Sequence, residues 1–264
     1  MIHRNMQTAL TSMLTISALW LAPAAALPQQ AGLKVTPEIV RMGAFYGGAP
    51  VRVEGVTGPD EKVVIVVRGQ KLTEVFNKAG RVGPIWVNTG KVTISYVPSL
   101  LLVFSSEPVG ACLTRAAIDK YGLDPPALKK QMHIQSRAQD SGRVADDNFL
   151  YKAKQGSYRL ANGGVRMNQP DKDGLSYTLE FVLPKCAAPG QYQISVLECR
   201  EGEVVESSDV PLKVVEVGFP ALVAFLATQH SSAYGILCVV VALVAGFGID
   251  FVAARVFKRR MVGH

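Results

Sequence analysis

Histidine is scarce in this chain, and the shortage excludes several kinds of site. Of the four histidines, His3 and His264 lie at the two ends and His230 lies beside a long apolar segment, which leaves only His133 in the body. A metal site built from several histidines is therefore excluded, and a catalytic triad could use His133 alone. The chain also lacks the nucleophile elbow, the phosphate-binding glycine loop and the zinc-protease motif. We predict no metal ion, no cofactor and no enzymatic activity.

Charged residues are also few, and their distribution argues against nucleic acid as a partner. They make up 19% of the chain, against the roughly 25% of a typical soluble protein. The formal net charge is +7. Most of that excess comes from Arg4 and from four cations near the C-terminus, Arg255, Lys258, Arg259 and Arg260. A nucleic-acid-binding domain would instead gather its cations on one reading surface.

The four cysteines have no Cys-x-x-Cys spacing, so neither a redox motif nor a zinc knuckle is indicated. Cys238 lies inside an apolar segment, and the other three are Cys112, Cys186 and Cys199. In an oxidising compartment one pair of these could be bridged. An extended strand would carry Cys186 and Cys199 too far apart, so we expect any bridge to involve Cys112 and leave its partner open.

The N-terminal segment is typical of a secretory signal peptide. Arg4 is followed by an apolar stretch from Ala9 to about Ala22, and the small residues Ala24, Ala25 and Ala26 then fit a cleavage site. We predict a signal peptide over residues 1–26, cleaved after Ala26. An uncleaved N-terminal anchor is the alternative.

The C-terminal segment predicts a membrane anchor. Residues 217–249 contain no Asp, Glu, Lys or Arg, and in lipid such a segment must be helical to satisfy its own peptide groups. We predict a juxtamembrane segment at 218–232 and a transmembrane helix at 233–254. A basic tail at 255–264 would lie in the cytoplasm, because cations favour that side. The predicted location is the inner (plasma) membrane, with the body in the periplasm.

Short strands separated by turn residues fill most of the body. Residues 33–105 contain alternating and β-branched runs, with turns expected at 47–48 and 77–80, and a second block covers about 164–217. We predict a mainly β fold: an immunoglobulin-like β-sandwich ectodomain over 27–217. Tyr192, just after Pro189-Gly190, resembles the tyrosine corner of such sandwiches.

A helical insertion is predicted at about 107–156, with helices at 109–122, 124–135 and 146–155. His133 falls on the second of these and is expected to be an ordinary helix residue. Lys129 and Lys130 belong to a run of positive charge in this insertion. That run is either a solvated helical face or a surface for an anionic ligand, including lipid headgroups.

Three residues of the apolar segment could serve contact with another helix. Ala242 and Gly246 have the small-xxx-small spacing that lets two helices approach closely. Asp250 is an acid inside a membrane segment, either snorkelling towards water or meeting a polar residue of a partner helix.

Two segments carry a resemblance to a known family. Gly80–Asn88 (GRVGPIWVN) and Val97–Ser106 (VPSLLLVFSS) resemble an uncharacterised family of alphaproteobacterial transmembrane proteins with a signal segment, an ectodomain and a C-terminal span. The resemblance implies no catalytic residue, and by association only it implies a partner such as an anion exporter of the sulfite type. From the residues themselves, Trp86 and Tyr96 are expected in the core, and Arg81 and Asn88 are candidate surface contacts.

Two functions remain open from the sequence. The first is a single-pass, membrane-anchored accessory protein without catalysis, which contacts the lipid bilayer and an integral membrane partner such as a transporter. The alternative is a periplasmic module that binds an anionic ligand through Lys129 and Lys130.

Overall fold

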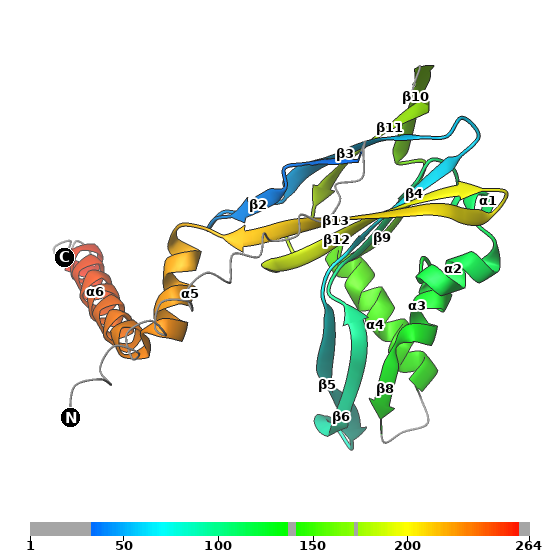
Figure 1. Ribbon diagram of the computed structural model, residues 1–264. Helices are drawn as coiled ribbons and strands as arrows, with labels where there is room; N and C mark the ends of the chain where they lie inside the picture. Colours follow the sequence, from blue (N-terminus) through cyan, green and yellow to red (C-terminus); the bar gives the residue numbers. More distant parts are fainter. Residues whose placement is uncertain (1–32, 137–140, 172–173, 259–264) are drawn as a thin grey trace, which may run out of the picture. The chain divides into compact units, whose positions relative to one another are not determined.

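A four-stranded antiparallel sheet forms one layer of the body. The computed structural model describes residues 33–136, 141–171 and 174–258 (Figure 1). The strands of this sheet lie in the order β1 (Lys34–Thr36), β3 (Ala49–Thr57), β11 (Gly174–Leu183) and β10 (Val165–Asp171).

A six-stranded sheet forms the central layer. Its order is β2 (Ile39–Met42), β13 (Glu203–Glu216), β12 (Gly190–Arg200), β4 (Lys62–Arg68), β7 (Leu101–Ser105) and β9 (Tyr158–Asn162). The outermost pairs, β2 with β13 and β7 with β9, are parallel, and the others are antiparallel.

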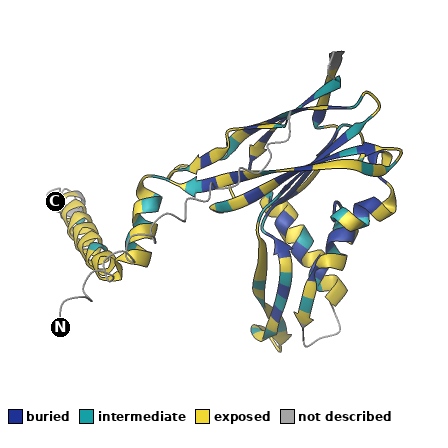
Figure 2. Cartoon of the chain, viewed as in Figure 1, coloured by how far each residue is buried: buried dark blue, intermediate teal, exposed yellow. Residues whose placement is uncertain are grey.

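Strand β4 is buried on both of its faces. Val63, Ile65 and Val67 belong to the core shared with the four-stranded sheet, whereas Val64 and Val66 belong to a second core on the opposite face (Figure 2). A strand that is covered on both sides needs apolar residues at every position. This explains why the sequence of β4 is an unbroken β-branched run and not an alternating one.

Four helices between the two β blocks supply the second core with part of its apolar surface. They are α1 (Val109–Cys112), α2 (Arg115–Tyr121), α3 (Pro125–Gln131) and α4 (Ser141–Gln155). Thr114 caps α2 by accepting from Ala117 N, Asp124 caps α3 by accepting from Ala127 N at 2.8 Å, and Gly122 ends α2 with φ 61°. The helix predicted over 109–122 is therefore two short helices.

A third sheet is built on one long hairpin. Strand β5 (Lys71–Val82) pairs with β6 (Ile85–Pro98), which pairs in turn with β8 (His133–Ser136). The predicted turn at 77–80 is wrong, because β5 runs through those residues with only a register shift. The hairpin turns at Gly83-Pro84, where Gly83 has a φ of 61° that suits the first central residue of a type II′ turn.

Three residues lie in surroundings that differ from the prediction. Trp86 and Tyr96, expected in the core on adjacent strands, are both on β6 and both exposed. Trp86 lies beyond the layers that could cover it, and a φ of 63° at Tyr96 breaks the alternation so that Val97 is buried instead. His133 was expected on a helix, but α3 ends at Gln131 and His133 pairs with Ser95 in β8.

The prediction of a mainly β fold with one C-terminal apolar helix is confirmed. The contact expected for a tyrosine corner is present, because the Tyr192 hydroxyl donates to Ala188 O at 2.7 Å. The order β1–β3–β11–β10, facing a sheet that contains β13–β12–β4, is compatible with an immunoglobulin-like sandwich. The immunoglobulin likeness itself stays a prediction.

Two apolar helices follow the last strand. These are α5 (Phe219–Gln229) and α6 (Ser231–Lys258), and within α6 the residues Ser231–Arg255 are long and apolar enough to cross a membrane. The helix therefore extends beyond the predicted boundaries of 233–254. The predicted signal peptide at 1–26 and the last tail residues, 259–264, lie outside the described part of the chain.

Removing the hydroxyl of Tyr192 tests the role of this corner. Tyr192→Phe removes the hydrogen bond that the Tyr192 hydroxyl donates to Ala188 O and should lower the free energy of unfolding by about 1 kcal/mol in urea denaturation. Tyr96→Phe is the matched control, because Tyr96 is exposed, and it should leave stability unchanged. Equal stability of the two variants would contradict the assigned role.

Candidate functional site

The free end of the β5–β6 hairpin presents a group of exposed apolar side chains. We call Arg81, Val82, Ile85 and Trp86 the hairpin tip. Val82 and Ile85 are more than half exposed, and Trp86 is 71% exposed. Val82 pairs with Ile85 and Arg81 with Trp86 across the two strands, so each pair shares one face of the hairpin and the two pairs lie on opposite faces.

Two of the predicted contact residues belong to this hairpin. The Arg81 guanidinium donates from Nε to Gly83 O at 3.1 Å, which ties the side chain to the turn. Asn88 Oδ1 accepts from Gly90 N at 3.1 Å, which is a local turn contact on β6. The structure therefore places Arg81 at the hairpin tip. Asn88 lies a short distance along β6, and its side chain stabilises the local backbone through the hydrogen bond from Gly90.

Beyond Glu74 at its base, the hairpin carries charge of one sign only. Lys78, Arg81 and Lys91 are exposed, and no Asp or Glu occurs from Val75 to Ser106. The apolar tip is thus accompanied by cations alone, a combination suited to a negatively charged partner surface.

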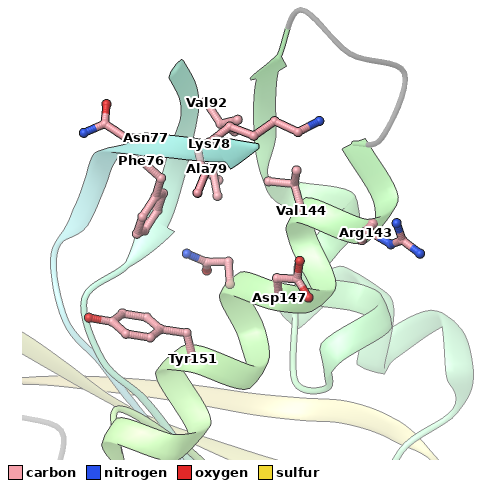
Figure 3. A pocket seen from close by; sticks show the side chains of 11 residues that line it. Phe76, Asn77, Lys78, Ala79, Val92, Arg143, Val144, Asp147 and Tyr151 are labelled. Carbon is pink, nitrogen blue, oxygen red and sulfur yellow. The ribbon is translucent and has the colours of Figure 1, made fainter. Parts of the chain in front are cut away.

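A cavity of about 610 Å³ lies between the hairpin and α4 (Figure 3). Apolar side chains of both elements line it, together with the ring of Tyr151, which meets the ring of Phe76 edge-on with centroids 6.4 Å apart. Lys78, Arg143 and Asp147 add charged groups to the lining. The mixture of apolar wall and charged groups is typical of small-molecule sites.

A buried polar contact joins α4 to the base of the hairpin. Lys152, nearly fully buried, forms an ion pair with Glu74 of β5, and Asn148 Nδ2 donates to the other Glu74 oxygen at 3.3 Å. Asn148 Oδ1 has no hydrogen-bond partner in the described structure. The opposite amide orientation would set that oxygen against the Glu74 carboxylate, so the donor must face Glu74. This contact fixes one wall of the cavity.

The two lysines predicted to bind an anion are already in ion pairs. Lys129 pairs with Asp146 of α4, and Lys130 pairs with Asp119 of α2 at 2.6 Å. The hydrogen bond from Lys130 lowers the pKa of Asp119. Since each of these two lysines has an acidic neighbour brought from elsewhere in the sequence, neither presents an unpaired positive charge to an anionic ligand.

A polar cluster where β3, β4 and β12 meet was not indicated by the sequence. The Thr57 hydroxyl lies 2.9 Å from Glu61 Oε2 and 3.0 Å from Glu198 Oε2. One hydroxyl proton cannot serve both carboxylates, so one carboxyl must carry its own proton. Glu61 also accepts from Gly58 N and from Arg200, each within 2.8 Å, which identifies it as the ionised member.

The pKa values of this pair agree with that assignment. Burial raises the pKa of Glu198 to about 7. Burial also opposes ionisation of Glu61, but hydrogen bonds from Gly58 N–H and from Thr57 outweigh it and lower the pKa of Glu61. The pair is thus a titrating group near neutral pH within the body.

Helix α6 displays the remaining predicted residues. Ala242, Gly246 and Asp250 follow one another at intervals of four and therefore share one face of the helix. All three are exposed, and a Cβ added at Gly246 would meet no atom within 4 Å. Within the described chain this face is uncovered.

One protein family matches nearly all of the described residues. The match runs from residue 31 to residue 258, and the family is described as "Putative transmembrane protein (Alph_Pro_TM)". The chain belongs to this family. No curated protein and no solved structure matches the chain. The family resemblance predicted from Gly80–Asn88 and Val97–Ser106 is therefore confirmed.

Membership in the Alph_Pro_TM family gives the apolar C-terminal helix its context. The family is one of transmembrane proteins, and α6 is the one candidate span among the described residues. The lipid bilayer is therefore the setting of this protein.

The cysteines of this Alph_Pro_TM protein are free thiols in the structure, so the bridge that Cys112 was expected to share, had one formed, is not present. Cys112 and Cys199 are buried in the second core, and burial raises the pKa of Cys199 to about 12. A thiol with so high a pKa is a poor nucleophile at neutral pH.

Of the hairpin tip of this Alph_Pro_TM protein only Arg81 was predicted as a contact residue, and the cavity and the Thr57 cluster were missed from the sequence. The acid-free stretch after Glu74 and the Gly83-Pro84 pair were readable signals for the tip. The cavity and the cluster are formed by residues far apart in the chain, such as Phe76 and Tyr151. A local sequence pattern therefore does not predict either of them.

A pH series on Glu198→Gln tests the shared proton. The folded pKa of about 7 lies above the ordinary 4.5, so the folded protein binds this proton more tightly than the unfolded chain does. The stabilisation is complete below about pH 4.5 and is lost as the pH rises through 7. Between pH 8 and pH 5 the unfolding free energy of the wild type should therefore rise relative to that of Glu198→Gln.

Urea denaturation at several pH values measures this difference. Glu201→Gln removes one carboxylate from an exposed turn and is the control. A stability difference between wild type and Glu198→Gln that does not change with pH would contradict the shared proton.

Proposed function

We propose that this protein is a non-catalytic accessory subunit of an integral membrane partner, held beside it by α6. The observation that carries the proposal is the uncovered face of α6 with Ala242, Gly246 and Asp250 in line. An acid within an apolar membrane segment is costly, and such acids usually face other helices and not lipid.

The chemistry of this face suits another helix. The small residues Ala242 and Gly246 let a second backbone approach closely, so that van der Waals contact and interhelical hydrogen bonds can form. Asp250 on the same face offers a strong acceptor or donor to a polar group of the partner. Close packing and one polar contact are the usual means by which membrane helices associate.

The proposed setting is the inner membrane, with the β-rich body in the periplasm and the C-terminal tail in the cytoplasm. Arg255 ends the apolar segment and further cations follow it in the sequence. Cations next to a span favour the cytoplasmic side. The partner in this proposal is a transporter, such as an anion exporter of the sulfite type, which the family resemblance implies by association only.

A second candidate function is supported by the cavity between the hairpin and α4. Its lining includes two cations, Lys78 and Arg143, against one acid, Asp147, and its walls are apolar. An amphipathic molecule with an anionic group would suit such a lining. Since Lys129 and Lys130 are already paired with aspartates, the cavity is the better place for this alternative. Binding that survives Arg143→Glu would count against it.

Substitution on the two sides of α6 tests the leading proposal. Gly246→Leu should block close helix packing and reduce partner recovery at least tenfold when the protein is purified from native membranes in mild detergent. Gly248→Leu is the matched control, because two positions along a helix are separated by about 200°. Its recovery of the partner should equal that of the wild type.

The measurement is quantitative mass spectrometry of the purified material, with membrane levels of each variant checked by immunoblot. A wild-type protein that purifies alone would overturn the proposal, as would equal recovery from the two glycine variants.

A further inference from the structure

The hairpin tip exposes apolar side chains for which the described chain offers no cover. At the end of β5 and β6, Val82 and Ile85 lie on one face of the hairpin and Trp86 on the other, and none of the three belongs to either hydrophobic core. Single exposed apolar residues are ordinary, but a group of three large ones at a projecting turn is a mark of an interaction site.

The composition of the hairpin matches the boundary between lipid and water. Tryptophan is enriched where hydrocarbon gives way to headgroups, and cations beside it are attracted to anionic lipids. Arg81 at the tip and Lys91 further along β6 supply that charge, and the sequence from Val75 to Ser106 contains no acid.

The backbone of the hairpin is also suited to a bilayer surface. Val82 pairs with Ile85 and Gly80 with Val87, so the inward-facing peptide groups of the two strands bond to each other up to the turn. The outward-facing peptide groups of both strands have no neighbouring strand at this end of the hairpin and need water or polar headgroups. The contact is therefore limited to the hydrated headgroup region, into which the turn and its side chains can reach.

The bilayer lies within reach of the body. Strand β13 ends at Glu216 and α6 begins at Ser231, and most of the intervening residues form the 11-residue helix α5. At 1.5 Å per helical residue and about 3.4 Å per extended residue, this tether spans roughly 30 Å at most. An anchored body meets the bilayer at high effective concentration, so even a weak contact of the tip would be populated.

We propose that the hairpin tip is a second membrane contact, which inserts Val82, Ile85 and Trp86 into the headgroup region of an anionic phospholipid bilayer. The inference depends on α6 as the span and does not depend on the accessory role. Two attachments, α6 and the tip, would hold the body in one orientation above the membrane.

Trp86 is a built-in probe for this contact. The chain has two tryptophans, Trp20 and Trp86, so Trp20→Phe makes Trp86 the only one even if the N-terminal segment is retained. The full chain with this change is reconstituted into phosphatidylcholine vesicles with or without phosphatidylglycerol, using lipids brominated on the acyl chains. With phosphatidylglycerol present, Trp86 emission should shift to the blue, be quenched by bromine and be protected from aqueous acrylamide.

Variants in the Trp20→Phe background separate charge from apolar contact. Arg81→Gln should reduce the ratio of inserted to free tip about fivefold, since a cation at an anionic surface contributes about 1 kcal/mol. Val82→Ser with Ile85→Ser should abolish the bromine quenching. Val182→Ser with Val205→Ser, two comparably exposed sites elsewhere in the body, is the control and should leave quenching unchanged.

The proposal would be overturned if Trp86 stayed accessible to acrylamide and escaped bromine quenching in vesicles without the charge and apolar substitutions. The tip would then be assigned to contact with another protein. Equal quenching with and without phosphatidylglycerol would also overturn it, as would loss of quenching in the Val182 and Val205 control.

Discussion

The peptide groups of α6 place the strongest constraint on this protein. Hydrocarbon offers no water to an unpaired N–H or C=O, so an apolar segment from Ser231 to Arg255 can be buried in lipid only as a helix that satisfies its own backbone. Its 25 residues span about 38 Å at 1.5 Å each, which exceeds the roughly 30 Å of hydrocarbon. With the short tether before it, this helix keeps the β-rich body close to the bilayer surface.

Within the body, both faces of the central sheet around β4 are covered, so functional groups cannot be exposed there. One face of the central sheet is closed by the four-stranded sheet and the other by helices and the base of the β5–β6 hairpin. The buried Lys152–Glu74 pair holds α4 against that base. What remains open is the cavity beside this contact and the far end of the hairpin. Both proposed surfaces of the body therefore lie on an extension of the sandwich, outside its packed layers.

The sequence predicted the elements better than it predicted their surroundings. The strand blocks at 33–105 and 164–217 were readable because turn residues and β-branched runs act locally. Trp86 was misplaced because apolar character does not reveal whether a layer covers that stretch of strand. His133 was misplaced because pairing with β6, distant in sequence, outweighed a local helical pattern. Lys130 was predicted to be available to an anionic ligand because its ion-pair partner Asp119 lies on the preceding helix, α2, and not close to it in the sequence.

The central claim is that α6 crosses the bilayer once and leaves the body and the C-terminus on opposite sides. Reporter fusions after His264 test this most directly. We expect green fluorescent protein fused there to fluoresce and alkaline phosphatase fused there to be inactive, as for a cytoplasmic terminus. An active phosphatase fusion, with a dark fluorescent one, would contradict the account and with it the placement of the body in the periplasm.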